Sequence, residues 1–263
     1  MSYTFIVRAM IVGGLVALCS ALLGVSLVLK RYSMIGDGLS HVAFAALTIA
    51  VAMNVAPLYI STPIVTVAAI ILLRLSENSK IKGDSAIALI STVSIAIGVV
   101  VTALTKGMNT DVYSYMFGSI LAMSESDVYM SIALSVVVII LFVFFYNKIF
   151  AVTFDESFAK ATGTKADAYN MIIAVLTAIT IVVGMRIMGT MLISSLIIFP
   201  ALISMRNFKT FKSVIICSAI VSVVCFFLGI VLSYLYSIPT GASIVLVNTV
   251  ALILSYLIGE LRN

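Results

Sequence analysis

The chain has 263 residues, of which 63% are hydrophobic and 10% are charged, with 15 Lys and Arg against 10 Asp and Glu. Soluble domains average about 45 to 50% apolar and about 25% charged residues, so this composition excludes a soluble protein and indicates an all-α, polytopic membrane protein in a lipid bilayer. The net charge of +5 fits basic cytoplasmic loops, and nothing in the sequence indicates a nucleic-acid partner.

Nine apolar segments follow one another in a single predicted transmembrane domain, residues 1–263. Each is close to the length of about 20 residues that crosses a bilayer, although three are short enough to leave a count of eight as the alternative. The first is too long for the apolar core of a cleavable signal, about 7 to 15 residues, so we expect a permanent span. The segments cover residues 3–29, 39–54, 58–75, 85–104, 128–146, 168–185, 188–205, 214–234 and 242–258.

The basic residues are distributed unevenly between the two sides of the predicted bundle. With the N-terminus outside, twelve fall on the cytoplasmic side and three, Arg8, Lys106 and Arg186, outside. The positive-inside rule therefore predicts an external N-terminus and a cytoplasmic C-terminus. Nine segments preserve this alternation, whereas eight would break it.

Two connections are more than turns. Residues 106–127 contain the apolar run 112–121, which is too short to span, so we expect a re-entrant or interfacial segment there. The cytoplasmic connection 147–167 predicts a short amphipathic helix over 154–163, with Phe154 and Phe158 on one face and Gly163 as its C-cap. Such a helix suits the docking of a partner, and the alternative is a helix resting on the membrane surface.

Asp37 and His41, the only histidine in the chain, form the strongest candidate site. On a helix, residues four apart share one face, and a carboxylate with an imidazole suits zinc, manganese or iron. Small residues throughout 36–46 would allow close helix packing around the pair. A second copy related by a two-fold axis would complete four ligands.

Two questions about the pair stay open at this point. In the structural alternative, Asp37 caps the second helix and His41 bonds a carbonyl group of a neighbouring helix. The pair also falls near the cytoplasmic end of its segment, so either the helix starts deeper than its hydropathy suggests or the pair lies near an inner gate. The three cysteines, Cys19, Cys217 and Cys225, lie in apolar segments, and we expect free thiols.

Five stretches resemble, in order, the membrane permeases of bacterial ATP-binding-cassette (ABC) importers for zinc, manganese or iron. The resemblance implies an importer-type fold in the bacterial cell membrane, a permease homodimer, a cytoplasmic ATPase and an extracytoplasmic metal-binding protein. It places a coupling helix to the ATPase at Phe154, Asp155, Glu156, Phe158, Ala159 and Gly163. The stretches are 36–44, 116–121, 154–163, 183–201 and 239–242.

This family is not enzymatic in its membrane subunit, and the chain has no phosphate-binding loop of the form G-x-x-x-x-G-K-[ST]. We therefore expect the partner to hydrolyse ATP, with zinc or manganese bound only transiently and no covalently bound cofactor. One alternative is a secondary transporter or channel for divalent cations, whose expected additional intramembrane acidic residues are not evident. The other is an intramembrane hydrolase, which would need an H-E-x-x-H motif or a second acidic partner for Asp37.

Overall fold

The computed structural model describes residues 2–78, 83–105 and 125–261, in which helices form the whole of the regular structure. Nine long helices match the nine predicted apolar segments. Eight are long and apolar enough to cross a membrane, and the apolar part of the remaining one, Leu192–Asn207, is shorter. The long helices are α1 (Ser2–Leu29), α2 (Ile35–Ala52), α3 (Pro57–Asn78), α4 (Gly83–Leu104), α6 (Glu125–Phe144), α9 (Ala166–Met188), α10 (Thr190–Asn207), α11 (Phe211–Tyr236) and α12 (Thr240–Leu261).

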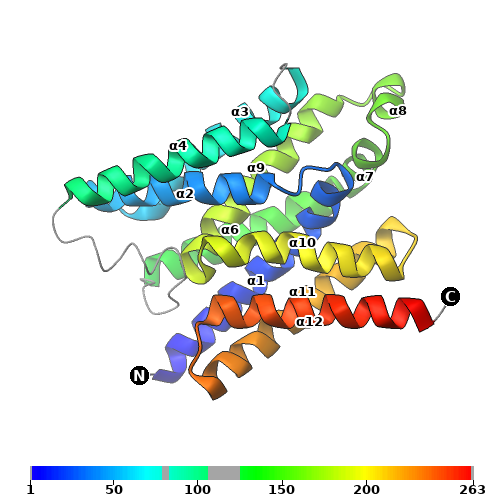
Figure 1. Ribbon diagram of the computed structural model, residues 1–263. Coiled ribbons are helices and arrows are strands. Elements are labelled where there is room, and N and C mark those ends of the chain that lie inside the picture. Colours follow the sequence, from blue (N-terminus) through cyan, green and yellow to red (C-terminus); the bar gives the residue numbers. More distant parts are fainter. Residues whose placement is uncertain (1, 79–82, 106–124, 262–263) are drawn as a thin grey trace.

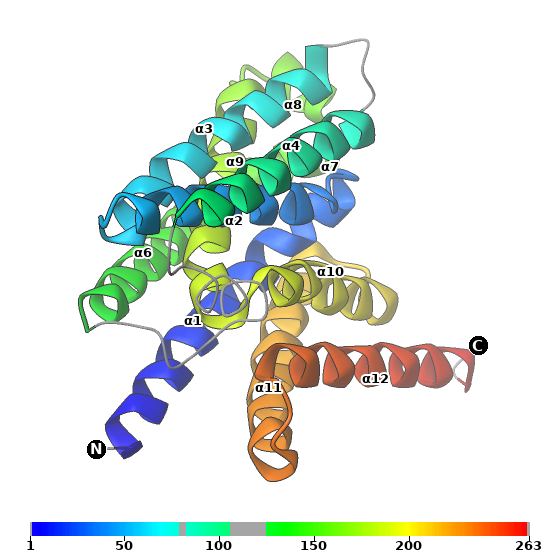
Figure 2. The same ribbon diagram turned by 60° about the vertical axis from the view of Figure 1, so that its left-hand side comes forward.

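The helices pack around a buried centre formed by α1, α2, α9 and α10 (Figures 1 and 2). On one side α2, α3 and α4 form a group, and on the other α11 and α12 pack against α1 and α10. The outer helices α4 and α12 expose most of their apolar residues, whereas α1 and α2 bury most of theirs. This is the expected distribution for a bundle that meets lipid with its outer helices.

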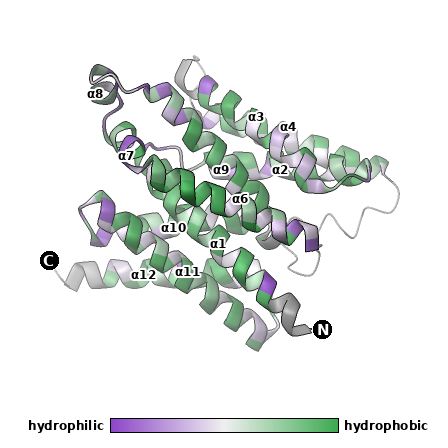
Figure 3. Cartoon of the chain, turned by 180° about the vertical axis from the view of Figure 1, so that it is seen from behind, coloured by the Kyte–Doolittle hydropathy of each residue, from purple (hydrophilic) through white to green (hydrophobic). Residues whose placement is uncertain are grey.

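Hydrophilic residues gather at the ends of the helices, while the lengths of the helices are hydrophobic (Figure 3). At one end, the last turns of α1 and α10 and the first turn of α11 line a common cavity of about 310 Å³ with Phe154. Asn207 there donates to Ser255 of α12, which brings the C-terminal part of α12 to the same end. We call this end, where α7 (Tyr146–Phe154) and α8 (Glu156–Ala161) also lie, the basic end. Its described basic residues include Lys30, Lys148, Lys160, Lys165, Arg206, Lys209 and Lys212.

The N-terminus lies at the opposite end of the bundle from the C-terminus (Figure 1). Near it, Arg8 of α1 donates to Glu125 at the start of α6 over 2.6 Å. The separation of the termini agrees with an odd number of spans. The apolar run 112–121, where a re-entrant or interfacial segment is predicted, lies outside the described residues.

The expectation of free cysteines is confirmed. Cys19, Cys217 and Cys225 are free thiols. Pro200 lies inside α10, and the hydroxyl of Ser204 donates to its carbonyl oxygen over 2.7 Å. The carbonyl that a proline here leaves without its helical partner is that of Leu196, four residues earlier, because Pro200 has no backbone N–H. The turn at Pro239 leads directly into α12 at Thr240.

Candidate metal centre

The helix that carries the pair begins earlier than its hydropathy predicts. The segment was expected from residue 39, but α2 starts at Ile35 and takes Asp37 into its first turn. The N-cap position is Met34, which makes no side-chain capping bond. Asp37 is therefore not the cap of α2, and its carboxylate lies where the positive end of the helix dipole favours a negative charge.

Asp37 and His41 are the only partly exposed residues among the first fourteen residues of α2. Every other residue from Ile35 to Thr48 is buried, whereas the side chains of Asp37 and His41 are 44% and 25% exposed. Among the residues that the structure describes, neither side chain bonds to a neighbouring helix. The structural alternative, in which His41 is satisfied by a carbonyl group, is therefore not what the structure contains.

The two side chains have a separation that suits a shared ion. Asp37 Oδ2 lies 3.7 Å from His41 Nε2, which is too long for a hydrogen bond. Two ligands of a tetrahedral zinc ion, each about 2.1 Å from the metal, lie about 3.4 Å apart. A small side-chain adjustment would bring both atoms to one ion. Within the described residues no cluster of three or more His, Cys, Asp or Glu is present, so no third residue of these types joins the pair there.

Glycines on either side of Asp37 position the start of α2 within the bundle. A Cβ at Gly36 would lie 3.0 Å from Ile197 of α10, and one at Gly38 would lie 2.7 Å from Ile87 of α4. Ile197 is the eighth of the 18 residues of α10, so the pair lies at the level of the middle of that helix. Figure 1 likewise shows the start of α2 set back toward the middle of the bundle from α7 and α8. Of the two possibilities for its depth, the structure favours the deeper helix start.

The predicted amphipathic helix over 154–163 is wrong in its N-terminal boundary. Two helices meet there, α7 (Tyr146–Phe154) and α8 (Glu156–Ala161), separated by Asp155 in an extended conformation. Asp155 Oδ1 accepts a hydrogen bond from the backbone N–H of Phe158 over 2.8 Å. Aspartate is a strong N-cap residue, so it starts a new helix here rather than continuing the old one.

The predicted C-terminus of this helix is confirmed at Gly163. Gly163 has a positive φ of 82°, its N–H donates to Lys160, and the N–H of Thr164 donates to Ala159. These two bonds form a Schellman motif, which needs a left-handed residue that glycine supplies at low cost. Gly163 therefore stops α8 after six residues.

Of the candidate coupling residues, two aromatic side chains face outward. Phe154 and Phe158 are 60% and 65% exposed, but they belong to different helices. Ala159 is buried against Val152 and Ala166, which attaches α8 to α7 and α9. The connection thus presents two phenyl rings at the basic end of the bundle.

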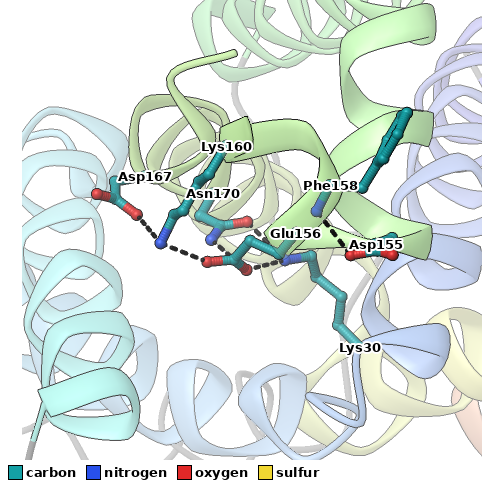
Figure 4. A network of polar contacts seen from close by, with 7 residues as sticks. All are labelled: Lys30, Asp155, Glu156, Phe158, Lys160, Asp167 and Asn170. Atoms are coloured by element: carbon teal, nitrogen blue, oxygen red, sulfur yellow. Dashed lines mark hydrogen bonds and ion pairs between the residues drawn. The ribbon is translucent and has the colours of Figure 1, made fainter. Parts of the chain in front are cut away.

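Glu156, one of the candidate coupling residues, is the centre of a polar network whose other members the sequence did not point to (Figure 4). Its carboxylate accepts from Lys30 over 3.1 Å, Lys160 over 3.0 Å and Asn170 over 3.0 Å. Partial burial opposes the charged form, but these three hydrogen bonds outweigh it and lower the pKa of Glu156 to about 2. Lys160 also pairs with Asp167 over 2.9 Å, and the two carboxylates raise the pKa of Lys160.

Comparison with known proteins places this architecture in one family. The model of the ABC 3 transport family matches residues 2–259. The manganese import system permease protein ScaB of Streptococcus gordonii is 26% identical over 97% of this chain and 92% of its own length. The high-affinity zinc uptake system membrane protein ZnuB of Haemophilus influenzae is 28% identical over 94% of this chain and 95% of its own length.

A solved structure agrees with the family match. A chain of PsaBC from Streptococcus pneumoniae, solved in complex with Fab, superposes with a TM-score of 0.87 at 27% identity. The superposition covers 97% of this chain and 92% of that one. The match spans all the long helices and nearly the full sequence, and the chain therefore belongs to the ABC 3 transport family.

Proposed function

We propose that this chain is the membrane permease of an importer that carries manganese or zinc, with iron as a further family substrate, into a bacterial cell. The observation that carries the proposal is the pair Asp37 and His41, the only partly exposed residues in an otherwise buried stretch of α2. Polar groups inside a membrane bundle are costly and are typical of transport pathways. The names of ScaB and ZnuB support manganese and zinc as cargo.

The metal ion in this proposal is cargo held by two copies of the chain. A homodimer with α2 facing its two-fold axis brings together two Asp37 and two His41 side chains, which gives four ligands. Because each copy holds half of the ligands, a relative movement of the two copies weakens the coordination and releases the ion. This arrangement binds the cargo without trapping it.

ATP hydrolysis belongs to a separate subunit that docks at the basic end. The exposed rings of Phe154 and Phe158 supply the docking contacts, while Asp155 and Gly163 start and stop α8. Ala159 and Glu156 attach α8 to the rest of the chain. The positive-inside rule supports a cytoplasmic basic end, with the N-terminus outside, where an extracytoplasmic binding protein delivers the metal.

The test is ATP-dependent uptake of zinc and manganese by vesicles that contain the chain, its ATPase and its binding protein. We expect His41→Ala to abolish uptake of both ions at equal protein level, with basal ATP hydrolysis and assembly retained. Ser40→Ala is the matched control, because its buried hydroxyl donates to the Asp37 carbonyl oxygen of its own helix. Wild-type uptake by His41→Ala would show that the pair is structural.

A further inference from the structure

Lys30, at the end of α1, reaches into the network around Glu156 (Figure 4). Its ammonium group donates to Glu156 Oε2 over 3.1 Å and to Asn170 Oδ1 over 2.6 Å. Asn170 in turn donates to the same Oε2 over 3.0 Å. The three side chains come from the residue directly after α1, from α8 and from α9, and they close a triangle of hydrogen bonds.

This triangle differs from an ordinary surface ion pair because its cation is buried. The Lys30 side chain is only 8% exposed, and Asn170 is buried. Separating the pair would leave the buried ammonium group of Lys30 without its counter-charge, which favours states in which Lys30 and Glu156 stay together. The end of α1 is thus held to the first residue of α8.

The end of α1 is also held firmly to the start of α2. The backbone N–H groups of Arg31 and Tyr32 donate to Val28 and Leu27, which closes α1 with a Schellman motif. Arg31 occupies the left-handed region with φ of 62°, a conformation that is strained for a residue with a Cβ and persists where its surroundings hold it. Ile35 N–H then donates to Tyr32, and Asp37 follows two residues later.

The other ion pair between α8 and a neighbouring helix connects it to α9 rather than to α1. Lys160 pairs with Asp167 of α9, and both side chains are at least half exposed. Exposed pairs contribute little to stability. Of these two attachments, the one through Lys30 leads to the helix that carries Asp37 and His41.

We propose that the ion pair of Lys30 and Glu156, braced by Asn170, is a positioning link that carries the movement of α8 to the metal-binding start of α2. The inference rests on the proposed function, in which the ATPase moves α8 and the metal binds to α2. It adds that the path between them runs through the end of α1. Neither side chain touches the metal.

The experiment measures metal ions transported per ATP hydrolysed by the complete complex in vesicles. We expect Lys30→Met and Glu156→Gln to lower this ratio at least fivefold, because hydrolysis continues while α2 no longer follows α8. The combined swap of Lys30→Glu with Glu156→Lys is made together with Lys160→Gln, because Lys160 otherwise places a second ammonium group beside the new lysine. It restores the ratio to within twofold of wild type, since the Asn170 amide can both donate and accept. Asp167→Asn, which breaks only the exposed pair, leaves the ratio unchanged.

Two further measurements separate this link from the proposed function. Lys30→Met keeps co-purification with the ATPase and keeps metal binding in the absence of nucleotide. A wild-type transport ratio in both single variants, or failure of the swap to restore it, overturns the link. Loss of ATPase co-purification in Lys30→Met also overturns it, since the pair would then only fasten the docking site. Absence of metal binding in the wild-type permease would count against the metal site itself.

Discussion

Gly24 of α1 lies directly against the carbonyl oxygen of Ile197 in α10, so closely that a Cβ at this position would overlap that oxygen. The same Ile197 contacts Gly36 at the start of α2 through its side chain. Three helices of the buried centre therefore meet at one residue. Their approach depends on glycine at two positions, which is the type of small-residue contact that brings membrane helices together.

Gly24→Ala should destabilise the permease, because the added methyl group overlaps backbone rather than a mobile side chain. Overpacking of this kind costs about 1 to 3 kcal/mol, and we expect thermal unfolding in detergent at a clearly lower temperature. Gly14→Ala is the matched control on the same helix, where the new Cβ would lie 3.6 Å from Phe227, an ordinary contact. Equal melting temperatures for the two variants would contradict the close approach.

Hydropathy predicted the nine long helices, because a span must be apolar throughout its length whatever its neighbours are. Hydropathy placed the start of α2 too late, because Asp37 and the glycines beside it are polar or small and so resemble a loop. In the structure the first helical turn stabilises the Asp37 carboxylate, and the helix includes it. The uneven distribution of basic residues was informative as well, since these residues gather at one end of the bundle.

The candidate site was predictable only in part. Asp37 and His41 could be found because an acid and the single histidine stand four residues apart in an apolar chain. The pairing of Lys30 with Glu156 could not be found from the sequence, since the two residues lie 126 positions apart and no local pattern connects them. The break at Asp155 was also missed, although its signal, a capping residue before a short helix, is present in the sequence.

The ligand chemistry of the pair predicts a change of selectivity in His41→Asp. Replacing imidazole by carboxylate leaves an all-oxygen site, which suits manganese better than zinc. We expect zinc uptake to fall by about tenfold more than manganese uptake, the scale of effect that changes around a metal site produce. Competition between the two ions in the same vesicles measures this ratio. An equal loss for both ions would indicate that selectivity lies outside this pair.

The predicted orientation of the chain in the membrane determines which end of the bundle a membrane-impermeant thiol reagent can reach. In a variant without the native cysteines, Ser126→Cys at the start of α6 should be labelled in right-side-out vesicles, whereas Lys209→Cys at the basic end should not. Inside-out vesicles should reverse the result. Labelling of Lys209→Cys from outside would overturn the orientation and place the exposed phenyl rings on the wrong side for an ATPase.

The lowered pKa of Glu156 predicts a stability difference that depends on acidity. The carboxylate has a pKa of about 2 in the folded chain against its ordinary value of 4.5, so the folded state favours the charged form. This contribution is fully present above about pH 4.5 and is lost as the pH falls toward 2, because the unfolded chain takes up the proton first. Glu156→Gln cannot titrate and lacks the contribution at every pH. Melting of both proteins in detergent at pH 6 and pH 3 should therefore show wild type more stable at pH 6, with a smaller advantage at pH 3. An advantage that is the same at both values, or that grows in acid, would mean that the bonds from Lys30, Lys160 and Asn170 do not favour the charged carboxylate.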